Sequence, residues 1–282
     1  MSQGPNASLT DDLGFRVALD RPPSRIVSLV PSWTETLFVM GITPSELVGV
    51  TKFCVEPAER VGPIAKVGGT KNPDLRAIVS LAPDLVIANA EENRREDIER
   101  LREQHIPVFV TYPKTIAAAV ETILGLGRAL FRESQANSLA REIVRTVSGI
   151  EASLGVWSSK LRLRAFCPIW KKPWMAFNAD TYAHDVLRML GFNNVFANAG
   201  ERYPRTTLDE ALSRRPDVFL LPDEPYEFKL SDVEELKAAI PPAMSRRVLI
   251  ISGRDLHWYG LHMVKGLPRL SALLAKVRAS LV

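Results

Sequence analysis

Thiol and imidazole side chains are the candidate metal ligands in this sequence. The thiols are Cys54 and Cys167, and the imidazoles are His105, His184, His257 and His262. No two histidines have the spacing of three or four residues that places two ligands on one face of a helix. Cys54 and His257 are therefore the candidate metal ligands, although a small buried hydrophobe is the commoner role of a cysteine.

Sequence motifs of nucleotide binding or covalent catalysis do not accompany these residues. The sequence contains no GxGxxG, HExxH or GxSxG motif, and Gly68-Gly69-Thr70-Lys71 lacks the upstream glycine of a phosphate-binding loop. Two distant cysteines provide neither a disulfide framework nor a CxxC zinc site. We therefore expect no catalytic residue, no intrinsic cofactor and no enzymatic activity.

Aromatic side chains gather on segments that follow expected strands. The candidate aromatic ligand contacts are Phe53, Trp170, Trp174, Tyr203, Trp258 and Tyr259. Such rings are costly to leave exposed on loops, and they suit a broad, flat, partly apolar ligand. The alternative is that each tryptophan fills the rim of its own domain. For the group as a whole we favour ligand binding.

Polar candidates lie on loops of the same kind. They are Thr70, Lys71, Glu92 and Arg94, together with Cys54 itself. Arg94 could contact a polar edge of the ligand or could pair with Glu91 at the start of an exposed helix. Acidic residues near a helix N-terminus are favourable without any function, so both interpretations stay open here.

Strands alternate with helices along the chain. The expected strands are Phe15–Leu19, Arg25–Val30, Leu47–Val50, Leu85–Ala88, Val108–Tyr112, Leu161–Ile169 and Val248–Ser252. The expected helices are Trp33–Met40, with Ser32 and Glu35 as a capping box, Asp74–Leu81, Asn93–Gln104 and Ile116–Leu130. This alternation is typical of a parallel sheet covered by helices.

One segment of the chain is repeated. Leu75–Ile87 aligns with Leu208–Leu220, so that Leu, Ser, Pro and Asp recur at identical spacing. Between the copies, Glu133–Trp157 contains no proline and places apolar residues at helical spacing. We predict a polar arm (1–20), an N-terminal α/β lobe (21–131), a connecting helix (132–158) and a C-terminal α/β lobe (159–282).

Composition excludes several classes of protein. The chain has 282 residues, 46% of them hydrophobic, and its formal charge of +4 is scattered rather than gathered in a stripe. This argues against a nucleic-acid-binding protein. The N-terminal sequence has no basic segment followed by an apolar one, as a secretory signal would. As written, the sequence predicts a cytoplasmic monomer, and a misassigned or trimmed start would make it periplasmic or extracellular.

The segments Arg25–Leu37 and Leu81–Ala88 resemble the helical-backbone metal receptor superfamily. Its members are the substrate-binding proteins of ABC importers for cobalamin, iron-siderophores and haem. The segments Gly68–Pro73, Glu91–Arg94 and Trp258–Gly260 resemble the cobalamin-binding branch. The resemblance implies two lobes with parallel sheets, one long joining helix and a metal chelate, such as a corrinoid, in a cleft between the lobes.

The resemblance also implies roles for particular residues. Phe53 and Tyr203 fall where the family places cleft aromatics, whereas Thr70 and Asn89 fall where it carries tryptophan. Asp209 matches the acidic residue that docks on an ABC permease, and Arg76 occupies the corresponding place in the first lobe. The alternatives are an iron-siderophore or haem as ligand, a stand-alone relative without a permease, or a cytoplasmic metallochaperone or enzyme that handles the chelate.

Overall fold

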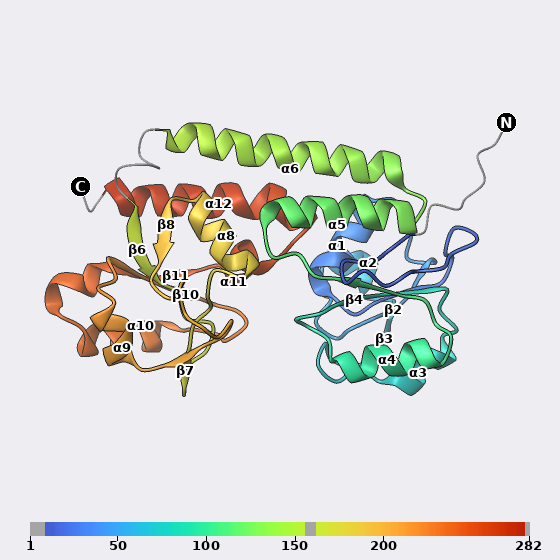
Figure 1. Ribbon diagram of the computed structural model, residues 1–282, viewed down its shortest axis with the longest axis horizontal. Helices are drawn as coiled ribbons and strands as arrows, with labels where there is room; N and C mark the ends of the chain where they lie inside the picture. The colour runs from blue at the N-terminus through green and yellow to red at the C-terminus, as the bar shows by residue number, and fades with distance from the viewer. Residues whose placement is uncertain (1–8, 156–161, 280–282) are drawn as a thin grey trace. The chain divides into compact units, whose positions relative to one another are not determined.

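The computed structural model describes residues 9–155 and 162–279. The chain divides into two compact units. Unit 1 consists of Met1–Pro113, Ala117–Ile143 and Tyr259–Leu261, and unit 2 of Lys114–Ile116, Val144–Trp258 and His262–Val282. Each unit contains a parallel sheet with helices packed against it (Figure 1). The expected α/β class with two parallel sheets is therefore confirmed.

Unit 1 is built on a parallel sheet of five strands in the order β3-β2-β1-β4-β5. The strands are β1 (Ile26–Ser28), β2 (Leu47–Val50), β3 (Ala65–Lys66), β4 (Leu85–Asn89) and β5 (Val108–Thr111). The expected strand over Phe15–Leu19 is wrong, because only Arg16 forms an isolated bridge there, with Thr10. The Asp11 carboxylate accepts from the amides of Leu13 and Phe15 and so turns the chain.

Helices cover the sheet of unit 1 on both faces (Figure 1). They are α1 (Pro31–Val39), α2 (Ala58–Val61), α3 (Leu75–Ser80), α4 (Arg95–Glu103) and α5 (Ile116–Ala129). Ile78 of α3 and Leu101 of α4 belong to one buried cluster with strand residues such as Val86. Helix α5 approaches β5 at Gly125, where an added Cβ would lie 3.2 Å from the Phe109 ring.

Helix α1 begins differently from the expected capping box. Pro31 is its first residue, Val30 is the N-cap residue, and no side chain caps it. Proline suits this position because it lacks an N–H and its φ is already helical. Ser32 therefore lies inside the first turn, where its buried hydroxyl oxygen has no hydrogen-bond partner among the described residues.

Unit 2 is built on a parallel sheet of four strands in the order β11-β10-β6-β8, with the antiparallel pair β7-β9 beside it. The strands are β6 (Leu163–Phe166), β7 (Trp174–Met175), β8 (Phe192–Asn194), β9 (Arg205–Thr206), β10 (Val218–Pro222) and β11 (Val248–Ile251). The helices are α8 (Tyr182–Met189), α9 (Leu208–Ser213), α10 (Leu230–Ala239), η1 (Pro242–Arg247), α11 (Gly253–His257) and α12 (Leu261–Ala279).

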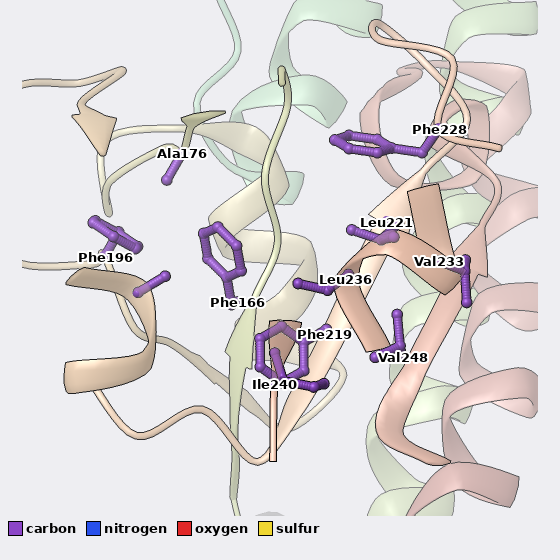
Figure 2. Close-up of a cluster of buried hydrophobic side chains, with 11 residues drawn as sticks. Phe166, Ala176, Phe196, Phe219, Leu221, Phe228, Val233, Leu236, Ile240 and Val248 are labelled. Atoms are coloured by element: carbon purple, nitrogen blue, oxygen red, sulfur yellow. The ribbon is translucent and has the colours of Figure 1, made fainter. Parts of the chain in front are cut away.

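An aromatic cluster forms the core on one face of the second sheet. Phe166 on β6 lies 5.8 Å from Phe196 and 6.2 Å from Phe219, measured between ring centroids. Val233 and Leu236 of α10 close this cluster, as Figure 2 shows. Burying side chains of this size contributes about 1.5–3 kcal/mol each, so the cluster anchors the strands whose ends carry the candidate site.

The sequence repeat corresponds to a repeated structural clamp. In unit 1 the Asp84 carboxylate accepts from the amides of Ser24 and Arg25, and the Arg25 guanidinium donates back to the Leu81 carbonyl. In unit 2 the Asp217 carboxylate accepts from the Arg164 amide in the same way, at 2.8 Å. Each Pro-Asp turn thus fixes the start of β4 or β10 beside the neighbouring strand.

The long connecting helix predicted over 132–158 is confirmed as α6 (Glu133–Leu154). At 1.5 Å per residue its 22 residues extend about 33 Å. Its buried positions repeat at helical spacing: Ala136, Leu139, Ala140, Ile143, Ile150 and Leu154. The helix contributes residues to both units, up to Ile143 in unit 1 and from Val144 in unit 2. Residues 156–158 of the predicted connection lie outside the described residues.

None of the described helices, α6 and α12 included, combines the length and the apolar character needed to cross a bilayer.

Candidate functional site

The predicted contacts in unit 1 lie on loops at one edge of its sheet. Because all five strands are parallel, their carboxyl ends meet at the same edge, where ligands bind in open α/β sheets. We call Thr51–Cys54, Gly68–Pro73 and Ala90–Arg94 the unit 1 loops. They follow β2, β3 and β4 respectively. The sheet topology therefore brings these three segments to one edge of the unit.

Phe53 is the aromatic side chain that the unit 1 loops expose, with 51% of its surface accessible. Its ring lies over the backbone of Gly69, because a Cβ added there would be 3.4 Å from Phe53 Cε2. The Lys52 ammonium group lies 5.1 Å from the ring centroid. A backbone surface and a neighbouring cation thus position the ring without covering it.

Cys54, one residue further on, is buried and only 1% exposed. Its sulfur lies 3.1 Å from the hydroxyl oxygens of both Thr34 and Thr51. Burial raises the pKa of the Cys54 thiol above its ordinary value and outweighs these hydrogen bonds. A protonated, enclosed thiol packs as a small hydrophobe, so this geometry does not support Cys54 as a ligand contact or as a metal ligand.

Two buried asparagines hold the loop after β4. The Asn89 side chain accepts from the amides of Glu91 and Glu92, while the Asn93 side chain accepts from the Asn89 amide at 2.8 Å. Asn93 also donates to the Thr70 carbonyl at 2.9 Å and so ties two of the loops together. The roles of these two asparagines were not predicted from the sequence, although asparagines at both ends of a strand-to-helix turn indicate such hydrogen bonds.

The polar candidates differ in what they contact. Arg94 is exposed and forms the N-cap position of α4 without a side-chain hydrogen bond to that helix. The Lys71 ammonium group donates to the Glu91 carbonyl, which places a cation on the loop after β4. Thr70 and Glu92 are half-buried. Contact of these residues with a ligand stays a prediction.

In unit 2, two loops of interest follow the carboxyl ends of β6 and β10. Trp170 lies beyond the end of β6 and is 43% exposed. Tyr226, in the loop after β10, supports it edge-on, with ring centroids 5.3 Å apart. Like Phe53, Trp170 is an aromatic ring held by a neighbouring side chain and open on part of its surface.

Lys171, the residue after Trp170, is buried. Its ammonium group donates to Asp232 at 2.6 Å and to Glu235 at 2.7 Å, both on α10. Burial by itself lowers the pKa of Lys171, but these two hydrogen bonds outweigh burial and raise it. Its ammonium group also lies 5.7 Å from the ring centroid of Trp174. The ion pairs therefore anchor the segment that carries Trp170.

Trp174 and Tyr203 are half-buried. Trp174 packs on the aromatic cluster of Figure 2, stacked on Phe228 at 5.9 Å and 14°. The guanidinium group of Arg202 lies 5.6 Å from the centroid of the Tyr203 ring. Both rings keep part of their surface accessible, and their contact with a ligand stays a prediction.

Trp258 and Tyr259 lie largely inside their own units. Trp258 is 9% exposed and donates its indole N–H to Glu224 at 2.6 Å. Tyr259, 5% exposed, stacks on Trp33 at 5.5 Å and 22° within unit 1. These contacts match the alternative in which each ring fills the rim of its own domain. A ligand contact at either ring stays a prediction.

His257 is the remaining candidate metal ligand. Burial lowers its pKa to about 4, so the imidazole is neutral at neutral pH. Its Nε2 atom is buried without a hydrogen-bond partner among the described residues, and its ring meets Phe177 edge-on. Over residues 9–155 and 162–279, no group of three or more His, Cys, Asp or Glu side chains is placed to hold a metal ion.

This arrangement can bind a ligand by surface contact. Each unit exposes an aromatic ring, Phe53 or Trp170, beyond the carboxyl ends of a parallel sheet. A helix of 22 residues is shared between the units. These features define the class of two-unit α/β binding proteins.

The chain belongs to the periplasmic binding protein family, whose model matches residues 26–245. This confirms the resemblance found in the sequence and identifies a family of binding proteins. One curated relative, a vitamin B12-binding protein of Vibrio parahaemolyticus, is 26% identical over 199 residues, which are 71% of this chain and 70% of the relative. Membership of this family does not support the expectation of a cytoplasmic protein.

Solved structures share the fold over nearly the whole chain. The periplasmic vitamin B12-binding protein BtuF of Vibrio cholerae matches with a TM-score of 0.77 and 18% identity, over 91% of this chain and 98% of that chain. The periplasmic haem-binding protein BhuT, in complex with two haems, matches with a TM-score of 0.77 and 22% identity, over 91% and 99%. Both likenesses concern the fold.

Proposed function

We propose that this protein binds a metal chelate, with a corrinoid such as cobalamin as the leading ligand, and acts in the periplasm without catalysing a reaction. The observation that carries the proposal is the exposed aromatic ring on the strand-end loops of each unit, Phe53 and Trp170. Such rings favour a ligand with a large apolar face. The names of curated relatives, which are vitamin B12-binding proteins, support the corrinoid.

Haem is the second candidate ligand. The fold is shared with a haem-binding protein, and Lys52 and Arg94, both exposed at or beside the unit 1 loops, could pair with carboxylates of a porphyrin. Cobalamin carries neutral amides around its ring, so it gains less from these cations. An iron-siderophore is the third ligand to be compared.

The test is a titration of the purified protein with cyanocobalamin, haemin and a ferric siderophore, followed by absorbance and calorimetry. The informative variant is Phe53→Ala, and Phe15→Ala is its matched control, because Phe15 is 52% exposed and also belongs to unit 1. If Phe53 contacts the ligand, its loss should weaken binding about 30-fold, the effect of about 2 kcal/mol at a buried hot spot.

Phe15→Ala should leave the affinity unchanged. Equal affinities of the two variants would contradict a ligand contact at Phe53. Stoichiometric binding without a change in the metal's oxidation state supports a binding protein, whereas turnover of the chelate would support the enzyme or metallochaperone alternative.

An ABC permease is the proposed protein partner. Asp209 is exposed in the first turn of α9, and Arg76 is exposed in the first turn of α3, the matching helix of unit 1. Opposite charges at matching positions would make docking asymmetric between the two units. Replacing Asp209 with Lys should weaken binding to the permease and leave chelate binding unchanged.

A further inference from the structure

Unit 2 contains a cavity of about 410 Å³ beside the edge strand β8. Its walls include Arg162, Arg164, Arg188 and His184 together with three asparagines, and none of the described residues that line it is acidic. None of the predicted chelate contacts borders this cavity. It is therefore a concave site separate from the predicted chelate contacts, and its lining is mainly polar and basic.

The fold brings these side chains together from separate segments. His184 and Arg188 are four residues apart on α8 and so share one face of that helix. Arg164 on β6 and Asn193 on β8 are register partners, so their side chains leave the same face of the sheet. Because β8 ends the strand order, its outer side is not covered by another strand among the described residues.

Some of the positive charge near the cavity is already engaged. Arg164 donates through Nε and Nη2 to two backbone carbonyls before the Pro-Asp turn, as Arg25 does in unit 1. Arg188 pairs with Asp185 at 2.8 Å. Asp217 accepts from the Arg164 amide. Arg162 donates to the Arg188 carbonyl at 3.5 Å. The three guanidinium groups outnumber the two neighbouring carboxylates, so the balance of charge around the cavity is positive.

His184 also belongs to the wall of the cavity. Its Nδ1 atom is buried and has no hydrogen-bond partner among the described residues. A buried polar atom without a partner costs about 1–3 kcal/mol. Burial lowers the pKa of His184 below its ordinary value, so the ring is neutral at neutral pH.

We propose that this cavity binds a small organic oxyanion, either a phosphate ester or a dicarboxylate. Guanidinium groups match the oxygens of both in charge and geometry. Phe192 and Val195 in the wall provide an apolar surface for the carbon part of the ligand. The volume suits a metabolite of moderate size, within the usual range for ligand pockets.

The test is calorimetric titration of the full chain with inorganic pyrophosphate, glycerol phosphate and malonate. Arg162→Gln removes one charge, and Asn193→Asp places a negative charge at an exposed lining position without changing its shape. Each change should weaken anion binding about tenfold, the effect of one charge-assisted contact. The matched controls are Arg95→Gln, whose side chain is 84% exposed in unit 1, and Asn137→Asp on α6.

Binding of a phosphate probe that weakens in both cavity variants, with unchanged controls, supports a phosphate-ester site. The same pattern with malonate supports a dicarboxylate site. If none of the three probes binds, or if the controls weaken binding as much as the cavity variants, the proposal is overturned. Thermal melting of every variant shows that the comparison is made between folded proteins.

Discussion

Replacing Lys171 with methionine removes the ammonium group that neutralises two carboxylates of α10 while preserving the length of the apolar stem. The Lys171 side chain is 4% exposed, and that of Asp232 is 13% exposed. Glu235 is 62% exposed, so water can solvate its carboxylate after the change. The main penalty therefore comes from Asp232, which would hold an uncompensated charge in a largely buried position.

Removing one partner of a fully buried ion pair costs about 3–5 kcal/mol. Because one of the two carboxylates here is open to water, we expect Lys171→Met to lower the free energy of unfolding by about 2–4 kcal/mol. The matched control is Lys237→Met on α10, because the ion pair of Lys237 with Glu234 is exposed. Exposed pairs contribute about 0–1 kcal/mol.

The assay is urea denaturation followed by circular dichroism, supported by calorimetry. Adding Asp232→Asn to Lys171→Met should recover part of the loss, because the uncompensated carboxylate is then absent. If Lys171→Met and Lys237→Met destabilise the protein equally, the assignment of Lys171 as a buried anchor is refuted.

Three further stability predictions follow from single residues. Gly149→Ala on the exposed side of α6 should raise the free energy of unfolding by about 0.5–1 kcal/mol, because an added Cβ meets no atom within 4 Å and the unfolded chain loses freedom. Gly260→Ala should lower the free energy of unfolding in the same urea assay, because Gly260 has φ +68 and an added Cβ would overlap Thr36. A variant as stable as the unmodified protein would contradict this local geometry. Burial alone raises the pKa of Asp84, but hydrogen bonds from Ser24 and from the backbone amide of Arg25 lower this pKa below its ordinary value of 3.8. The carboxylate therefore stabilises the fold above pH 3.8. The destabilisation caused by Asp84→Asn should shrink as the pH falls through the folded-state pKa of Asp84. A decrease in the free energy of unfolding that does not depend on pH would contradict this assignment.

Much of the architecture could be predicted because the signals that specify it are local. The repeat around the two Pro-Asp turns predicted matching helix–turn–strand units, and the clamp at Asp84 and Asp217 explains why this dipeptide recurs. The apolar spacing over Glu133–Trp157 predicted the long helix, which the structure shows as α6 over Glu133–Leu154. The capping box predicted at Ser32 was wrong, because a second local signal was present. Pro31 begins the helix one residue before Ser32, which therefore lies inside the first turn.

The sequence by itself determined the class of fold, the two parallel sheets, the long helix and the loops that follow the strands. These features depend on periodicity and turn residues, which act over a few positions. Only the tertiary structure decided which candidate side chains reach the surface. The partners that bury Cys54, Trp258 and Lys171 lie 20, 34 and 61 residues away in the chain, at Thr34, Glu224 and Asp232. Burial is a property of contacts between distant segments, and residue type and local spacing carry no information about which distant segment will cover a given loop.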